Sequence, residues 1–553
     1  MEFQVRYVAA YLRGGYVEMT RIGRLGVSFR RFAFRALPVP AIFVVSCASF
    51  QTSDAVDEIV RLREKCQELQ TAMDKGLSET VVRSKVSTQA RIHKDFEYLF
   101  TPTKLEILDR RFSSSSDPDE KEAVRRLRHF LVSRNIGYKQ AGVVDDLLNF
   151  ENETIISVDE KSVAYRYLHA DLANEKNRDV RRKLYLASST YFEADNVLLG
   201  QLVTIEAREI AAHGYSDYLA FFAEEKSFDP ARLETAARSL LATSDSLYAA
   251  LLEEICREKF NLRPVDVKSY DIPILLRMSD FDEHFRVKTL VDVVDRVYGG
   301  MGIPFKRQAK IRLTTGDADQ LMEGTHVYGV LVPNDVRLSH RTLGGAPDFA
   351  SLLHGAAAAL HYANTTETLL EFKNFGTHSA REGYGFLFEY LLDDPLALDR
   401  FIKLPAEVRG AYFKVRAFSR LHEARTMCAD YLLQLALLKG REGIQERYYD
   451  IMRSALKYEL TDRDAQRALR HNDFFAVADR MRGLFLEPYM KAYFKRQFGD
   501  EWYTKQEAGR FLQAQWALGQ KEQLSKIEAK FGADAYDWRP CFDGMLQLLR
   551  SNP

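Results

Sequence analysis

One stretch of this sequence carries the residue types that a hydrolytic metal site needs. Residues 351–364 are rich in Ala and Leu, which predicts a helix, and include His354. A zinc hydrolase of the His-Glu-x-x-His type places two His ligands four residues apart on one helix face, with Glu after the first His as general base. Here the base position holds Gly355 and the second ligand position holds Ala358. Glu382, 24 residues beyond position 358, is the candidate third ligand.

The same segment resembles the zinc-helix region of the thimet oligopeptidase and oligoendopeptidase family, which are gluzincin metallopeptidases. That family reads His-Glu-x-Gly-His-Ala-x-His, and this chain matches it at His354, Ala359 and His361. Residues 199–223 resemble the helix, glycine turn and tyrosine pattern of the family, and the likeness covers roughly residues 90–545. It implies a mainly α fold, a large helical gluzincin-like body with a small β-sheet before the zinc-type helix, enclosing a cleft.

The remaining candidate ligands are too few for a catalytic zinc. His354 and Glu382 would provide two ligands, whereas catalytic zinc takes three protein ligands and a water. His361 lies seven residues along the helix, about 10.5 Å of rise, which is too far to share the ion. His340 and His378 are nearby alternatives. We therefore expect His354 and Glu382 to be a remnant metal site without zinc, and no cofactor.

The base and oxyanion positions lead to the same expectation. Gly355 offers no carboxylate to accept a proton from water, and residues 470–480 hold Phe where the family carries a Tyr. We expect a pseudopeptidase that is not an enzyme and that binds peptides or a protein partner in a retained cleft. One alternative is a residual zinc metallopeptidase that uses His354, Glu382 and a non-standard ligand. Another is a structural envelope lipoprotein whose cleft is filled.

Short strands are predicted before the His354 helix. Residues 310–314, 326–332 and 335–341 alternate apolar and polar side chains and are rich in β-branched residues. The family resemblance implies that the edge strand just before the zinc helix pairs with an extended substrate. The candidate peptide-binding residues are therefore Val336, Arg337, Leu338 and Ser339. A plain structural hairpin is the alternative.

The N-terminal segment resembles an export signal. Five arginines between residues 19 and 35 precede an apolar run at 36–45, which is too short to span a bilayer as a helix. Val44–Cys47 resembles a bacterial lipobox, so Cys47 is the predicted lipidation site and Met19 the predicted start. We expect an exported lipoprotein on the periplasmic face of the cell envelope, in the outer membrane, with the lipid as its only membrane contact. An ordinary secretory signal or a buried strand remains an alternative.

Composition limits the other functions and the organisation of the chain. The 78 basic and 78 acidic residues balance, and no basic face stands out, so we expect no nucleic-acid partner. Gly (30) and Pro (15) are sparse for 553 residues, which favours helices. We predict a signal segment at 1–47, an N-terminal helical half at 48–300 and a metallopeptidase-like half at 301–553. The four cysteines after the signal contain no Cys-x-x-Cys pair, and disulfides or free thiols are both open, at Cys66, Cys256, Cys428 and Cys541.

Overall fold

Asp-Pro pairs mark the beginning of three helices. Asp117, Asp229 and Asp394 are N-caps, and each is followed by Pro at the first helical position. Each carboxylate accepts a hydrogen bond from a backbone N–H of the first turn, a group that has no partner within the helix. Pro has no backbone N–H of its own that would need a partner, and it already has a helical φ, so it fits at the first helical position.

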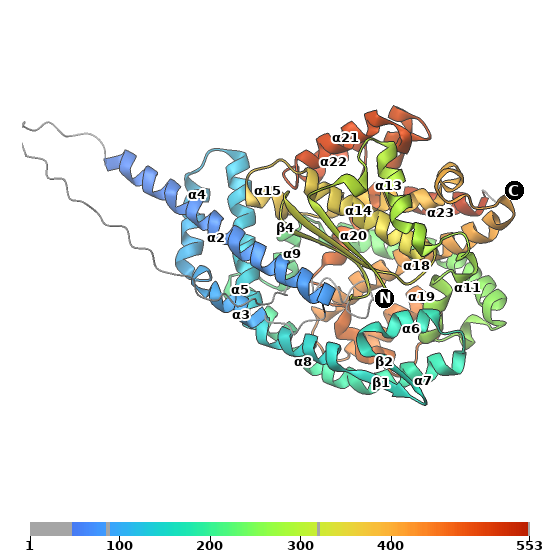
Figure 1. Cartoon of the computed structure of the whole chain (residues 1–553). Coiled ribbons are helices and arrows are strands. Elements are labelled where there is room, and N and C mark those ends of the chain that lie inside the picture. Colours follow the sequence, from blue (N-terminus) through green and yellow to red (C-terminus); the bar gives the residue numbers. More distant parts are fainter. Residues whose placement is uncertain (1–46, 84–88, 318–320, 551–553) are drawn as a thin grey trace, which may run out of the picture.

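A computed structural model describes residues 47–83, 89–317 and 321–550, and Figure 1 shows the arrangement of its elements. The elements before the three-stranded sheet are α2 (Cys47–Arg83), α3 (Gln89–Asp95), α4 (Pro102–Ser114), α5 (Pro118–Glu153), β1 (Ile155–Val158), β2 (Lys161–Ala164), α6 (Leu168–Asn174), α7 (Arg178–Ser188), α8 (Phe192–Ala212), α9 (Tyr218–Glu225), α10 (Pro230–Thr243), α11 (Asp245–Phe260), α12 (Ile272–Leu276) and α13 (Leu290–Gly300).

The second part of the chain begins with the strands of this sheet and returns to helices. Its elements are β3 (Ile311–Gly316), β4 (Gly324–Leu331), β5 (Asp335–Arg341), α14 (Ala346–Asn364), α15 (Leu370–Asn374), α16 (Ser379–Glu389), α17 (Pro395–Ala397), α18 (Ala406–Leu437), α19 (Ile444–Leu456), α20 (Ala476–Phe498), α21 (Gln506–Ala517), α22 (Leu524–Phe531) and α23 (Arg539–Arg550).

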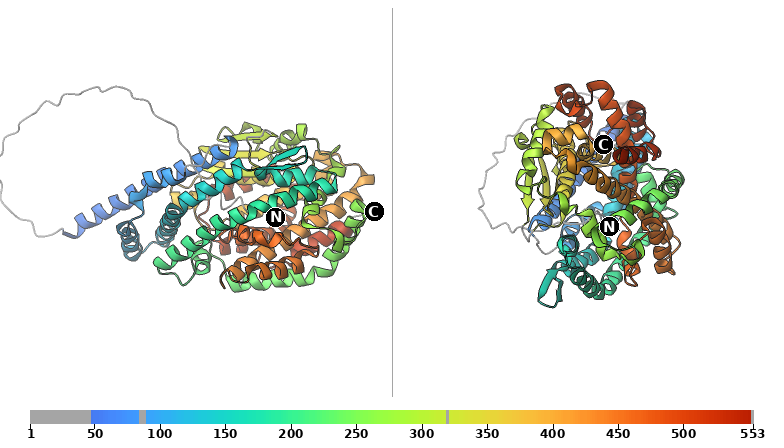
Figure 2. Two further views of the ribbon diagram at one scale, coloured as in Figure 1. Left: turned by 90° about the horizontal axis from the view of Figure 1, so that it is seen from below. Right: turned by 90° about the vertical axis from the view of Figure 1, so that its right-hand side faces the viewer.

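The three-stranded sheet has the order β3-β5-β4. β5 pairs with β3 in parallel and with β4 antiparallel, so both of its edges are occupied. Side chains alternate between the two faces. Val336 and Leu338 belong to the core that includes α14, whereas Arg337 faces α2 and donates a hydrogen bond to Ser78 at 2.7 Å. Figure 2 shows the sheet, in yellow-green, on one side of the helical body.

The long helix α2 covers the outer face of this sheet. Leu77 packs with Tyr328 and Val330 of β4, and Figure 1 shows α2 beside the sheet. Further along α2, Arg63 donates to the buried carboxylate of Glu371 at 2.7 Å. α2 is therefore anchored to the second half of the chain at two separate places.

Two large hydrophobic cores hold the body together, and each contains residues from both predicted halves. One core includes residues of α5, α8, α10, α11, α18 and α19, and the other includes residues of α13, α14, α16, α20 and α21. α18 contributes to both cores through Phe418 and Tyr412, and so does α20 through Leu484 and Leu486. These two helices join the halves into one packed structure.

The sequence predicted the mainly α class and the position of the small sheet correctly. α8, a turn at Gly214 with φ of 87°, and α9 reproduce the predicted helix–glycine–tyrosine segment.

The signal segment lies outside the described residues, except for the backbone of Cys47, where α2 begins. Among the described residues no helix is long and apolar enough to cross a membrane. The four cysteines that follow the signal segment are buried free thiols in the structure, namely Cys66, Cys256, Cys428 and Cys541.

Glycine allows α16 and α20 to cross closely. A Cβ atom at position 483 would lie 2.4 Å from the Cβ of Glu382 and 2.8 Å from the backbone nitrogen of Gly383. Backbone atoms cannot move aside as a flexible side chain can. The position of Glu382 is therefore coupled to the absence of a side chain at Gly483.

We expect Gly483→Ala to lower the free energy of unfolding by about 1–3 kcal/mol, because α16 and α20 must separate. Gly142→Ala is the matched control, since a Cβ there meets nothing within 4 Å. In this control the free energy of unfolding should rise by up to about 1 kcal/mol, because Ala has a higher helix propensity than Gly. Urea denaturation of both variants provides the comparison. Equal stability of the two would show that the helix crossing tolerates a methyl group.

Candidate functional site

His354 of α14 lies between two carboxylates of α16. Its Nε2 is 3.4 Å from Oε2 of Glu382, and its Nδ1 is 3.1 Å from Oε2 of Glu389. The imidazole also packs against α16, where a Cβ at Gly385 would come within 2.2 Å of the ring and Phe386 meets it edge-on. The structure thus brings together the two residues that the sequence predicted as a pair and adds Glu389 as a second partner of His354.

The pair is ionised. Burial disfavours the charged imidazole, but hydrogen bonds and charge from Glu382 and Glu389 outweigh it and raise the pKa of His354 to about 9. Burial also disfavours the Glu382 carboxylate, yet His354 lowers its pKa to about 2. At neutral pH, His354 is therefore an imidazolium whose two N–H groups face two carboxylates.

The neighbouring positions do not fit a three-ligand zinc site. A Cβ at Gly355 would lie 2.3 Å from Cγ2 of Thr325 in β4, so the sheet fills the space in which a general-base side chain would begin. Ala358 is buried and offers no donor atom. Within the described ranges, no group of three or more His, Cys, Asp or Glu side chains is arranged to hold a metal ion.

The other histidines have separate roles. His361 is buried and donates from Nε2 to the carbonyl of Gly519 at 3.1 Å, as a core histidine does. Nδ1 of His340 lies 2.7 Å from the hydroxyl of Thr325. The backbone N–H of His378 donates to Asp479 at the N-terminus of α16. The structure places none of these three beside His354 as a third partner.

The prediction that residues 336–339 form an edge strand was wrong. Val336, Arg337, Leu338 and Ser339 lie in β5, whose two edges pair with β3 and β4. Their backbone cannot accept a peptide by strand addition. The outer strands are β3 and β4, and residues 327–329 of β4 line a cavity.

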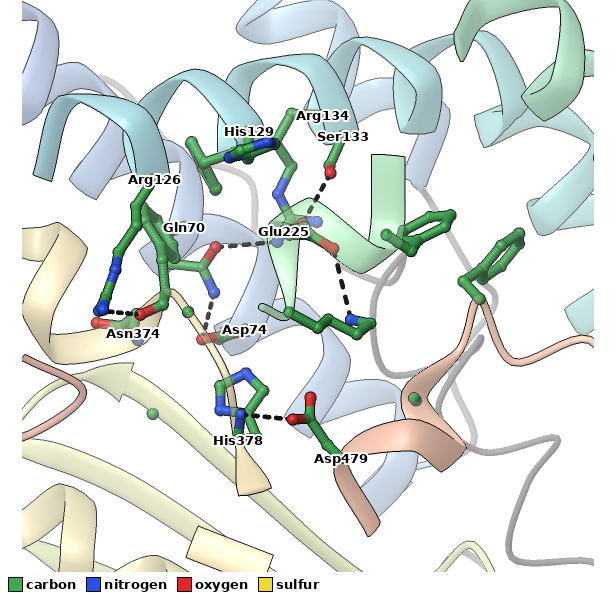
Figure 3. Close-up of a pocket in the computed structure, with 18 of the residues that line it drawn as sticks. Gln70, Asp74, Arg126, His129, Ser133, Arg134, Glu225, Asn374, His378 and Asp479 are labelled. Carbon is green, nitrogen blue, oxygen red and sulfur yellow. Dashed lines mark hydrogen bonds and ion pairs between the residues drawn. The ribbon is translucent and has the colours of Figure 1, made fainter. Parts of the chain in front are cut away.

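A cavity of about 180 Å³ lies between the N-terminal helices and the second half of the chain. Its walls include residues of α2, α5, α8 and α9 on one side, and of β4, α15 and the segments before α16 and α20 on the other. Figure 3 shows Gln70 of α2 between Asp74 and Arg134, with hydrogen bonds to Asp74 of 2.8 Å and from Arg134 of 3.0 Å. A space of this size holds on the order of ten water molecules.

Sequence reasoning missed the charged residues of this cavity, although one signal was present. In α8, Leu199, Leu202 and Ile210 form the buried stripe, and Glu206 occupies the same face. A carboxylate on an apolar helical stripe is unusual unless it has a buried partner or a function. The sequence alone gives no way to identify what faces it, because the other wall comes from segments more than 100 residues away.

The His354 ion pair predicts a pH dependence of stability. A folded-state pKa raised from 6.5 to about 9 stabilises fully below pH 6.5, and this contribution is lost as pH rises to 9. Glu382, lowered from 4.5 to about 2, contributes above pH 4.5. We expect the free energy of unfolding to fall by about 1–3 kcal/mol between pH 6.5 and 9 through His354. In His354→Gln this fall should be absent, and urea denaturation across that range measures it. An unchanged slope in the variant would assign the effect to other groups.

No protein-family model and no curated protein sequence matches this chain. An X-ray structure at 3.1 Å described as oligoendopeptidase F superposes with a TM-score of 0.63 at 14% identity. PZ peptidase A, solved with an inhibitor, superposes with a TM-score of 0.64 at 12% identity. Each alignment covers 91% of this chain and 93% of the other.

These similarities correct one expectation and support another. The expectation that the chain is not an enzyme was wrong, because both of these structures are of peptidases. Gly355 and Ala358 replace the general base and the second metal ligand of one zinc-dependent mechanism. Their presence concerns that mechanism alone and not catalysis in general. The resemblance seen at His354 and residues 199–223 is confirmed for the architecture, which extends over nearly the whole chain. The chain has the helical fold of the thimet oligopeptidase and oligoendopeptidase family.

Proposed function

We propose that this protein acts on short peptides by binding them in the cavity between α5, α9 and β4. The observation that carries the proposal is the cavity itself, which the side chains leave open at about 180 Å³. It favours binding over the alternative of a structural protein with a filled cleft. The peptidase structures of the same fold support peptides as the ligand class.

The chemistry of the walls suits a peptide backbone. β4 is one of the two outer strands of its sheet, and residues 327–329 line the cavity, so extended backbone can lie beside it. Opposite β4, α5 and α9 contribute polar groups. Ser133 donates to Glu225 there at 3.1 Å, as Figure 3 shows. A ligand with alternating N–H and C=O groups can bond both walls.

A blocking substitution tests this proposal. Ser133 is buried in α5 and lines the cavity, so Ser133→Phe should fill it and lower the affinity for a labelled octapeptide by about tenfold or more. Ser113→Phe is the matched control, because Ser113 is exposed in α4. Fluorescence anisotropy with labelled octapeptides of different charge measures binding. Thermal unfolding confirms that both variants fold.

Cleavage and metal content are measured on the same samples. Mass spectrometry of the peptides, with and without a chelator, shows whether binding leads to hydrolysis. Zinc content after dialysis, compared with that of His354→Ala, tests the misfit described at His354. One zinc per chain that is lost in the variant would contradict it. Absence of saturable binding, or equal binding by Ser133→Phe, would contradict the peptide proposal.

We also propose that Cys47 carries a lipid anchor, on the strength of the lipobox-like sequence Val44–Cys47. Cys47→Ser should move the protein from the membrane fraction to the soluble fraction of a bacterial host, because the acyl chains supply the membrane affinity. Cys66→Ser, at a buried cysteine of α2, is the control and should leave the distribution unchanged. Mass spectrometry of the N-terminal peptide identifies the lipid. A soluble wild type with an unmodified Cys47 would refute this proposal.

A further inference from the structure

The charged side chains of the cavity do not balance. Five carboxyl groups and three Lys or Arg side chains line it. Arg126 is paired with Glu122 at 2.6 Å, and Asp479 with Arg482 at 2.9 Å; both partners lie outside the lining. Without these two, four carboxyl groups face two cationic side chains. The carboxyl groups are Asp74, Glu206, Glu225 and Asp473, and the cations are Arg134 and Lys226.

The two histidines of the lining do not supply the missing positive charge. Nε2 of His129 lies 3.3 Å from Glu224, a carboxylate outside the lining. Burial lowers the pKa of His378 to about 3, so this side chain is neutral at physiological pH. Among the lining side chains the excess of two carboxyl groups therefore remains. From outside the lining, Arg381 lowers the pKa of Asp74 and Arg480 lowers that of Asp473, whereas the described surroundings of Glu206 contain no such cation.

Glu206 shows the imbalance most directly. It is 2% exposed, accepts a hydrogen bond from the side chain of Asn472, and leaves Oε2 without a hydrogen-bond partner. Burial raises its pKa well above the usual range, and the nearby charge of Glu225 acts in the same direction. A buried carboxyl oxygen without a donor is costly, by about 1–3 kcal/mol or more. A donor from a ligand would remove that cost.

Asp473 and Asp74 are also incompletely compensated. Burial raises the pKa of Asp473 to about 7 despite a hydrogen bond from Gln434 and the charge of Lys226. Burial raises the pKa of Asp74 to about 6, although Arg134 lowers it. Asn472, which bonds Glu206, immediately precedes Asp473, so these two carboxyl groups belong to one end of the cavity.

We propose that this end of the cavity binds a cationic group of the peptide ligand, an ammonium or a guanidinium, through Glu206 and Asp473. This inference rests on the peptide-binding function proposed above and specifies the charge of its ligand. A charge-assisted hydrogen bond to Glu206 would use the unpartnered oxygen and pair a buried carboxylate. The rings of Phe222 and Phe474, with centroids 5.8 Å apart, line the same cavity and provide π faces for the cation.

Matched pentapeptides test the charge preference. The probes are acetyl-Ala-Ala-X-Ala-Ala-amide with X as Lys, Arg, norleucine or Glu, and the norleucine peptide with a free amino terminus. Isothermal titration calorimetry should give affinities for the Lys and Arg peptides about tenfold or more above that of acetylated norleucine. The free-amine arm distinguishes an N-terminal ammonium from a side-chain cation, and tighter binding in either arm supports the proposal.

Glu206→Gln keeps the shape of the side chain and removes the acidic group that can ionise against a bound cation. We expect it to reduce the preference for a cationic peptide to about threefold or less, while binding of the norleucine peptide stays unchanged. Glu193→Gln is the matched control, an exposed position on the same helix α8. Asp473→Asn is a second variant with the same expected direction. Thermal unfolding verifies that each variant is folded.

The outcomes separate this inference from the function on which it rests. If all pentapeptides bind equally, or if Glu206→Gln keeps the full preference, the cation site is refuted and peptide binding stands. If the Glu peptide binds best, the sign of the proposal is wrong. If no peptide binds saturably, the peptide-binding function fails as well.

Discussion

The contact of His354 with Glu382 and Glu389 fixes the relation between α14 and α16, on which the second half of the chain depends. The buried carboxylate of Glu382 and the half-buried carboxylate of Glu389 lie on one helix and repel each other, so a positive charge between them is favourable. The imidazolium of His354 supplies that charge, with N–H groups 3.4 Å and 3.1 Å from the two carboxylate oxygens. Its ring reaches this place because Gly385 has no side chain to exclude it.

The same constraint extends to the helices around the pair. Glu382 can face His354 only if α20 passes close behind α16, which the absence of a side chain at Gly483 allows. On the other side of α14, Thr325 and Leu338 of the sheet press against Gly355. Helix α14, which carries the histidine, is therefore closely packed both against α16 and against the sheet. Substitutions that restore a motif at position 355 would first have to move the sheet.

Much of the fold could be predicted because its signals are local. Alternating side chains at 326–332 and 335–341 identified the strands, and the glycine at 214 identified a helix end. The order of the strands in the sheet is not a local property. Alternation shows which side chains share a face of the sheet, but it does not show which strands are neighbours. β3 lies beside β5 because the two strands pair in parallel, although β4 lies between them in the sequence. For that reason residues 336–339 were assigned to an edge. The loss of Glu and His at 355 and 358 was likewise a local observation, and it could not decide whether the whole protein is an enzyme.

The cavity could not be predicted from local signals, because its charge arises from the meeting of distant segments. Glu206 on α8 and Asp473 before α20 are 267 residues apart in sequence, and nothing in the sequence around either residue identifies the other as its neighbour. The role of these two carboxyl groups depends on their burial in the folded protein. Hydrophobic packing of α5, α8 and α18 carries these carboxyl groups away from water, and too few cations accompany them to restore the balance. Because the cost at Glu206 and Asp473 falls beside an open space, a ligand in that space can compensate it.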